Sequence, residues 1–395
     1  MTLSVHRADA ARAPDWLPIG QLLTFTVAGF LAIMTENMPA GLLPQIGKGL
    51  GVSEAMAGQM VTLYALGSVV AAIPVIAVTR RWRRRPLFLS AIAGLLIFNS
   101  ITALSAHFGL TMAARFFAGM AAGVVWGLVA GYARRLAPPH LQGRAMAIVG
   151  IGQPIALSLG VPLGAWLGAL QDWRLVFWMM SGLALLLVAW VRLGVPDHPG
   201  QPSQSQPSVS QVIAMPGVRS VLLVLLAWIL AHNILYTYVA PFLRDTNAGI
   251  GVDVALLIFG LSSIAGIVAT GALVDRHLRL LTLTNLAMFI VAVLIFALSS
   301  AALWPLIIGL ALWGFTFGGA PTLLQTELAD VAGEQADIAQ SVLVTVFNLA
   351  VAGGGMLGGI WVDAQGAILL PWLVLPLAIL GWTVTWQTKA FGRHS

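Results

Sequence analysis

Long uninterrupted apolar runs constrain this chain more than any other feature of its sequence. A helix that crosses a lipid bilayer needs about 20 mostly apolar residues. Twelve such runs are expected to form helices, at 18–44, 54–78, 86–106, 109–133, 141–168, 174–194, 218–244, 253–275, 279–299, 303–327, 336–362 and 368–388. Membrane-barrel strands are short and alternate, whereas these runs are long and continuous. The sequence therefore predicts an all-α integral membrane protein with twelve transmembrane helices.

The composition excludes a water-soluble protein. Charged residues make up 9% of the chain and hydrophobic residues 59%, whereas a soluble domain carries roughly 25% charged residues. The basic residues behind the net charge of +6 lie between the apolar runs, which indicates membrane topology and not nucleic-acid binding. Cysteine is absent, which excludes disulfides and thiolate metal sites. The polar start of the chain does not resemble a cleaved signal peptide.

The basic residues also predict the orientation. With both termini in the cytoplasm, 16 of the 20 Lys and Arg residues fall on the cytoplasmic side. The other side holds Lys48, Arg174 and Arg244, and Arg115 falls inside a run. This asymmetry follows the positive-inside rule. Arg outnumbers Lys by 18 to 2, as in GC-rich bacterial genomes, so we expect a multi-pass protein of a bacterial inner membrane with both termini cytoplasmic.

A polar stretch divides the chain. Residues 196–211, PDHPGQPSQSQPSVSQ, lack apolar periodicity and are typical of a flexible linker. We expect a six-helix half, a cytoplasmic linker and a second six-helix half at 1–194, 195–217 and 218–395. Similar segments occur in both halves, 80–85 with 271–279 and 159–168 with 353–362. These pairs indicate that the halves are diverged copies.

Several stretches outside the linker carry longer motifs. They are TENMPAGLLP at 35–44, RFFAGMAAGVVWG at 115–127, GVPLG at 160–164 and AHNILYTYVAPFL at 231–243. Together they resemble the proton-coupled drug and sugar efflux branch (arabinose-efflux-permease-like) of the major facilitator superfamily, over essentially the whole chain. The resemblance implies two halves that alternately open a central cavity to either side. It implies a small-molecule substrate, a coupling proton and no cofactor, but it does not identify the substrate.

The loop after the second run departs from the superfamily's motif, G-x-x-x-D-R-x-G-R-R. With Arg84 and Arg85 at its final pair, Arg80 stands where the acidic residue belongs and Ile76 replaces the first glycine. The second half matches the motif at Gly271, Asp275 and Arg276. The resemblance therefore implies that Arg84, Arg85 and the motif of the second half form a cytoplasmic gate. It implies that the second-half motif makes the ion pairs of this gate.

Two charged residues lie well away from the ends of their runs. Glu36 is the only acidic residue that we place deep in a run, and an ionised carboxyl group there is costly, so it takes up a proton or binds a partner. We interpret it as a proton carrier; the alternative is a structural Glu that hydrogen-bonds a neighbouring helix. Arg115 keeps its proton. It either packs against helix-end carbonyls or acts as a fixed charge that tunes Glu36, and the resemblance favours the second.

The seventh run offers the densest polar group. Trp228, His232 and Tyr236 follow each other at i, i+4 and share one helix face, with Asn233 beside them. Such a face can stack on a sugar or an aromatic drug, although satisfied core residues are the alternative. Further substrate-binding candidates, for which hydrogen bonding between helices is the alternative, are Asn37, Trp126, Gln153 and Asn348.

Glycines cluster in the fifth and eleventh runs. GGGMLGG at 353–359 contains the G-x-G-x-x-G spacing of dinucleotide sites, but that fingerprint needs a preceding strand. Inside an apolar run small residues instead let helices approach closely. We therefore expect Gly160, Pro162 and Gly164 at the moving interface between the halves. No phosphate-binding loop occurs, so ATP is not the expected energy source.

These features predict a secondary transporter, a proton antiporter that exports a sugar or a small drug-like compound. Glu36 would take a proton in the outward-open state and release it in the inward-open state, where the substrate binds. An uptake symporter remains an alternative, as does a membrane-embedded sensor or enzyme, although we find no cluster of catalytic side chains. We expect no enzymatic activity, no metal, and a monomer in the lipid bilayer.

Overall fold

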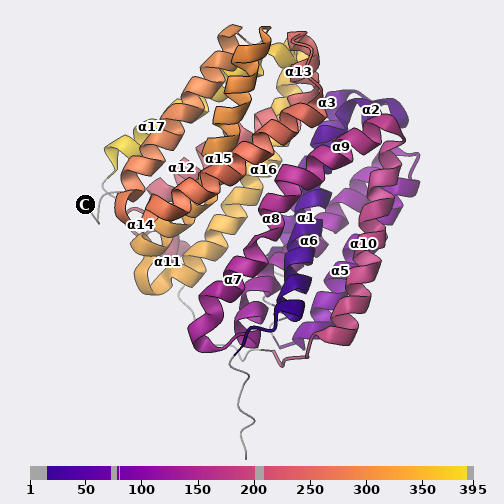
Figure 1. The fold of residues 1–395 in the computed structure, drawn as a ribbon, viewed down its shortest axis with the longest axis vertical. Helices are drawn as coiled ribbons and strands as arrows, with labels where there is room; N and C mark the ends of the chain where they lie inside the picture. The colour runs from indigo at the N-terminus through magenta and orange to yellow at the C-terminus, as the bar shows by residue number, and fades with distance from the viewer. Residues whose placement is uncertain (1–15, 73–77, 80, 201–208, 300, 389–395) are drawn as a thin grey trace, which may run out of the picture.

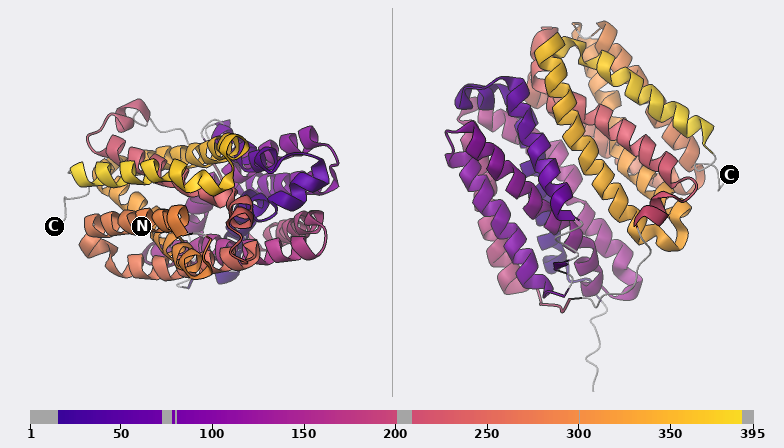
Figure 2. Two further views of the ribbon diagram at one scale, coloured as in Figure 1. Left: turned by 90° about the horizontal axis from the view of Figure 1, so that it is seen from above. Right: turned by 180° about the vertical axis from the view of Figure 1, so that it is seen from behind.

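The computed structural model describes residues 16–72, 78–79, 81–200, 209–299 and 301–388. In these residues the regular structure is helical, and the helices form two bundles that lie side by side (Figures 1 and 2). The first half contains α1 (Ile19–Gly41), α2 (Leu43–Leu50), α3 (Glu54–Ala72), α5 (Arg84–Leu104), α6 (Phe108–Leu136), α7 (Gln142–Gly150), α8 (Gly152–Ile155), α9 (Val161–Leu170) and α10 (Trp173–Gly194). The second half contains α11 (Val209–Ile213), α12 (Val218–Thr237), α13 (Val239–Thr246), α14 (Val252–Ser299), α15 (Leu303–Ala332), α16 (Ala336–Gln365) and α17 (Leu370–Gln387).

The helices are consistent with the predicted twelve crossings. Ten stretches of helix in the described part of the chain are long and apolar enough to span a membrane. One of them, α14, has 48 residues and a non-helical backbone at His277, so it holds two segments of spanning length. The 19-residue α3 packs along α6 and ends where the described residues stop. An all-α membrane fold is therefore confirmed.

Two predicted helices are interrupted, and a third contains an irregular turn. The first run breaks at Leu42, between α1 and α2, and the seventh breaks at Tyr238, between α12 and α13. Pro44 and Pro241 follow these breaks within the first turn of the new helix, where a missing N–H costs little. The fifth run contains a π-helical turn, Ala156–Gly160, between α8 and α9. A continuous helix was the wrong prediction for the first and seventh runs, because apolarity alone does not locate a break, whereas the fifth run stays helical over Gln142–Leu170.

Glycine contacts show that the halves repeat one packing unit. A Cβ atom on Gly119 of α6 would lie 1.9 Å from the carbonyl oxygen of Tyr64 in α3. A Cβ atom on Gly314 of α15 would lie 2.2 Å from the carbonyl oxygen of Phe259 in α14. The second contact follows the first by 195 positions. The same offset relates Gly123 and Ser68 to Gly318 and Ser263.

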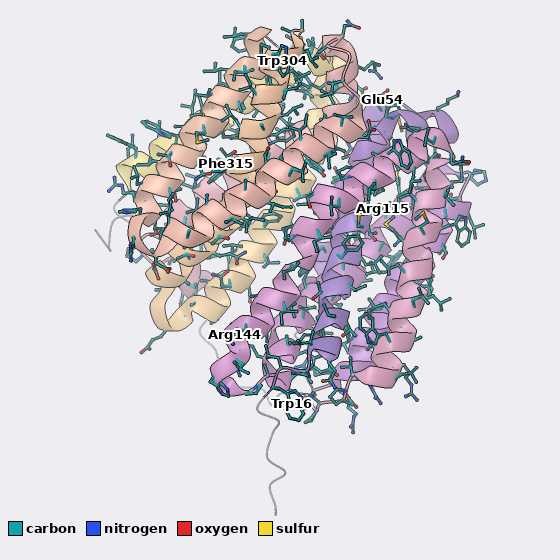
Figure 3. The ribbon with its side chains drawn as sticks, viewed as in Figure 1. Trp16, Glu54, Arg115, Arg144, Trp304 and Phe315 are labelled. Carbon is teal, nitrogen blue, oxygen red and sulfur yellow. The ribbon has the colours of Figure 1, made fainter. Side chains whose placement is uncertain are left out.

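The two ends of the molecule differ in charge. One end, here called the basic end, carries the arginines at 83–85, 134–135, 144, 192, 219, 276 and 279. The other, the opposite end, carries Lys48, Arg174 and Arg244. Figure 3 shows Arg144 at the lower, basic end and Glu54 at the upper, opposite end. The helix order thus gathers the basic residues as the sequence predicts.

The halves are joined at the opposite end. Arg244 of α13 forms an ion pair with Glu54 at the start of α3. Gln59 of α3 donates to the carbonyl oxygen of Gly355 in α16 at 3.0 Å, and Thr62 of α3 donates to that of Ala352 in α16 at 3.3 Å. Figure 1 shows the two bundles converging here and diverging toward the basic end. This conformation is therefore closed at the opposite end.

The first part of the linker is held against the first half. Asp197 forms an ion pair with Arg83 and accepts a 3.0 Å hydrogen bond from the amide of Arg85. The amide of Arg84 donates to the carbonyl oxygen of His198 at 2.9 Å. Residues 196–199 are thus bound to the basic end, and flexibility was the wrong prediction for them. Residues 201–208 lie outside the described residues.

Replacing Asp197 with Asn is expected to weaken this attachment in a pH-dependent way. Burial raises the pKa of Asp197, but the hydrogen bonds from Arg83 and Arg85 and their charges hold it below its ordinary value. A lowered pKa contributes stability above the ordinary value of about 3.9, and that stability is lost as the pH falls through the folded-state pKa.

We therefore expect the variant to be less stable than wild type at pH 7, by about 1 kcal/mol or less because Arg83 is largely exposed. The difference should shrink as the pH falls below the ordinary value of about 3.9 and through the folded-state pKa. Thermal unfolding in detergent across this range measures it, with the exposed Asp363→Asn as control. A difference that grows toward low pH would contradict this assignment.

Candidate functional site

Glu36 carries a buried carboxyl group inside the first half. It lies on α1 six residues before the break at Leu42, and 8% of its surface is exposed. Among the described residues its side chain makes no hydrogen bond or ion pair. A structural Glu would form a hydrogen bond to a neighbouring helix. No such bond is found among the described residues.

Arg115 lies directly beside the backbone of Glu36. It is fully buried in α6, where its Nη2 donates to the carbonyl oxygen of Glu36 at 3.3 Å and its Nε to that of Met60 at 3.2 Å. Its guanidinium carbon lies 4.7 Å from the ring centre of Tyr64. Figure 3 shows Arg115 inside the first half. The arginine is thus a fixed charge bound to the backbone of Glu36, and among the described residues it forms no ion pair with the Glu36 carboxyl group.

Two buried polar residues were missed by the sequence analysis. Tyr64 donates from its hydroxyl to the carbonyl oxygen of Ala32 at 2.8 Å and covers Arg115. A tyrosine in a membrane run is a weak signal of such a role. Glu327 is the second, and it is 2% exposed. The predicted run ended at Glu327, whereas α15 continues to Ala332 and buries it.

Five rings form an aromatic cluster in the second half. They belong to His232 and Tyr236 of α12, Phe259 of α14, and Trp313 and Phe317 of α15. The His232 ring is stacked on Phe317 with centres 3.5 Å apart, and Trp313 Nε1 donates to His232 Nδ1 at 3.0 Å. The Tyr236 hydroxyl is buried without a hydrogen-bond partner in the described part of the chain.

The helices that carry Glu36 and His232 meet across the two halves. Helices α1 and α12 pack against each other. His232 lies six residues before the break at Tyr238, just as Glu36 lies six residues before Leu42. The structure therefore brings together two predicted polar groups at equivalent positions of the two halves.

The other substrate-binding candidates in the seventh and eleventh runs face elsewhere. Trp228 is fully buried but makes no ring contact with the aromatic cluster. Asn233 donates to its own helix at Ile229 and packs against Gly354 of α16. Asn348 donates to Val344 within α16 and is 8% exposed.

The remaining candidates come from the first half. Asn37 is half-buried and donates to Ile33 within α1. The Trp126 ring lies against Gly29 of α1, 3.3 Å from the position of an added Cβ. Gln153 is half-buried in α8. Of the eight predicted substrate-binding residues, only His232 and Tyr236 join one cluster.

The predicted gate residues lie at the basic end. Arg84 and Arg85 begin α5 and hold the linker through their amides. Asp275 and Arg276 are exposed next to the kink of α14 and make no ion pair among the described residues, and an added Cβ on Gly271 would meet nothing within 4 Å. Ile76 and Arg80 lie outside the described residues.

The glycines of the fifth run contact α1 of the same half. A Cβ on Gly160 would lie 2.3 Å from Met34, and one on Gly164 2.3 Å from Met38, with Pro162 between them. The helical segments that carry these residues, Ala156–Gly160 and Val161–Leu170, also pack against α14 of the second half, so their place at the moving interface stays a prediction. That interface uses Gly260 of α14, where an added Cβ would lie 2.2 Å from the Cα of Ser158, and Gly355 of α16.

Comparison with known proteins identifies the family. Residues 25–355 match the family model described as Major Facilitator Superfamily. The chain is 31% identical to a Pseudomonas aeruginosa protein named transcription regulatory protein OpdE, over 87% of each chain. It is 29% identical to the purine ribonucleoside efflux pump NepI of Escherichia coli O157:H7, covering 95% of this chain and 93% of that one.

The fold is also similar to a solved structure. The human organic anion transporter MFSD10 (TETRAN) matches with a TM-score of 0.67 at 18% identity, covering 94% of this chain and 100% of that one. This similarity supports the two-bundle architecture. The resemblance stated from the sequence motifs is therefore confirmed at the level of the superfamily. The protein belongs to the Major Facilitator Superfamily.

Proposed function

We propose that this protein is a proton-coupled antiporter that exports a purine ribonucleoside or a closely related molecule from a bacterial cytoplasm. The observation that carries the proposal is the buried carboxyl group of Glu36, which has no bonding partner among the described residues and whose backbone binds the fixed charge of Arg115. An ionised carboxyl group in a membrane span is costly without a partner. A proton, taken up and released in each cycle, relieves that cost.

The charge asymmetry supports the orientation. The basic end corresponds to the cytoplasm by the positive-inside rule. The conformation closed at the opposite end then corresponds to the inward-facing state. We propose that the substrate binds from the cytoplasm in this state as Glu36 releases its proton. After the halves rock, a proton entering from outside returns to Glu36 and the substrate leaves.

The substrate class rests on two supports. A relative of nearly full length is named a purine ribonucleoside efflux pump. A ribonucleoside combines a sugar with a flat aromatic base, and the aromatic cluster offers rings on which a base can stack. Both halves lie in one chain, so we propose that a monomer in the inner membrane is sufficient.

Inverted membrane vesicles test this function. Their lumen is acidified with an imposed gradient, inosine is added outside, and a pH-sensitive dye reports proton release. The proposal expects inosine to dissipate the gradient only in vesicles that contain the protein. If inosine instead strengthens acidification, an uptake symporter replaces the antiporter. If no nucleoside moves protons, proton-coupled nucleoside export is contradicted.

A second candidate function is the regulation of transcription in response to a ligand. The observation that favours it is the name of the relative from Pseudomonas aeruginosa. In that case deletion of the gene would change transcript levels, and Glu36→Gln would leave that response intact while transport is lost. If transcript levels change only in those variants that lose transport, the regulation is an indirect consequence of export.

A further inference from the structure

The two halves place different chemistry at equivalent positions. Glu36 and His232 each lie six residues before the break of the first helix in their half. Around Glu36 lie a fixed charge and a tyrosine, Arg115 and Tyr64. Around His232 the described neighbours are aromatic rings. The first half therefore concentrates charge and the second half concentrates flat apolar surface.

The hydrogen bond from Trp313 fixes the tautomer of His232. An indole N–H is a donor only, so Nδ1 of His232 must be the acceptor of the 3.0 Å bond. The neutral imidazole then carries its proton on Nε2. Protonation of Nδ1 would place two donors 3.0 Å apart, so this geometry holds the ring neutral. This arrangement therefore does not favour His232 as a second proton carrier.

The remaining polar atoms of the aromatic cluster are unsatisfied. Nε2 of His232 has no hydrogen-bond partner among the described residues, and it is not among the polar atoms sealed in the interior. The Tyr236 hydroxyl, 1% exposed on the next turn, is sealed and has no partner in the same set of residues. An unsatisfied buried polar group costs free energy, so a ligand that supplies its hydrogen bond is favoured. The parallel stack on Phe317, with planes 10° apart, fixes the direction of the Nε2–H bond.

We propose that His232 is a fixed hydrogen-bond donor to the exported molecule, and that it selects flat heterocycles that present an acceptor atom in the plane of the ring. Trp313 is the residue that positions it. This inference rests on the proposed function, since it assigns the recognition of the base to the second half and the proton to Glu36 in the first.

The test compares analogues that each lack one ring acceptor. Proteoliposomes loaded with adenosine exchange it for labelled adenosine, and 1-deaza-, 3-deaza- and 7-deaza-adenosine compete from outside. Each analogue replaces one acceptor nitrogen by C–H and keeps the shape of the base. Wild type is expected to bind one of them about 10-fold more weakly than adenosine, because a donor in the site is left unpaired.

Single-residue variants test whether His232 causes the weaker binding of that analogue. In His232→Phe, the same analogue and adenosine should compete equally. In Trp313→Phe, the KM for adenosine should rise several-fold while kcat stays within about twofold, because the donor is no longer held in one tautomer. The exposed His140→Phe is the matched control and should behave as wild type.

The outcomes distinguish a failure of this inference from a failure of the proposed function. Wild-type exchange with unchanged discrimination in His232→Phe overturns the inference alone. Equal competition by all analogues in wild type also overturns it, whether or not the variants fold. Absence of nucleoside exchange by wild type instead overturns the proposed substrate class.

Discussion

Replacing Glu36 with Gln is expected to abolish proton-driven export while substrate exchange continues. Gln fills nearly the same volume and keeps a polar tip, but it neither binds nor releases a proton. The Arg115 bond to the Glu36 carbonyl oxygen is made by the backbone, so the substitution leaves it in place. Losing a coupling free energy of roughly 3 kcal/mol lowers the coupled flux by about 100-fold.

Two assays on one preparation check this result. Inosine-dependent proton release in inverted vesicles should fall to background, whereas exchange of labelled for unlabelled inosine at saturating inosine should stay within about threefold of wild type, because exchange requires no proton to be taken up or released. Glu334→Gln, exposed in the short helix Gly333–Gln335, is the matched control. Proton release at the wild-type level in Glu36→Gln would show that Glu36 is structural.

Replacing Gly355 with Val is expected to stop transport by preventing closure at the opposite end. A Cβ at this position would lie 2.3 Å from the hydroxyl oxygen of Thr62, across the interface between the halves. Overpacking costs roughly 1–3 kcal/mol, which disfavours the inward-facing state by about 5- to 150-fold. The clash involves α3 and α16 of different halves, so each half should still fold.

Cysteine labelling measures this shift directly. The chain has no cysteine, so Asn37→Cys supplies a single half-buried site on α1. An impermeant maleimide is added from the side of the opposite end. It should label Asn37→Cys at least about 5-fold faster in the protein that also carries Gly355→Val than in the protein that keeps Gly355. Gly182→Val on the exposed face of α10, where an added Cβ meets nothing within 4 Å, is the control. Equal labelling of both variants would contradict the role of this interface.

Much of the fold follows from the sequence because a bilayer leaves few solutions. Backbone polar groups in lipid must be satisfied within each segment, so long apolar runs become helices. The basic residues at 83–85 and 134–135 then mark one end of the molecule. Glu36 and Arg115 stand out for the same reason, since charge inside an apolar run is costly.

The details of the site do not follow from such patterns. Phe259, Trp313 and Phe317 are ordinary residues of apolar runs, and only the packing of α14 and α15 against α12 gathers them around His232. Arg115 binds the carbonyl oxygen of Glu36 and not its carboxyl group, which residue type does not predict. Asp197 meets Arg83 from 114 positions away.

The most direct test of the account is the direction of inosine transport in proteoliposomes under an imposed pH gradient. With an acidic lumen, protons flow outward, and antiport predicts that inosine accumulates inside above its outer concentration. Reversal of the gradient should reverse the accumulation, and Glu36→Gln should show neither effect. Accumulation of inosine on the side that protons enter, or transport that ignores the gradient, would contradict proton-coupled export.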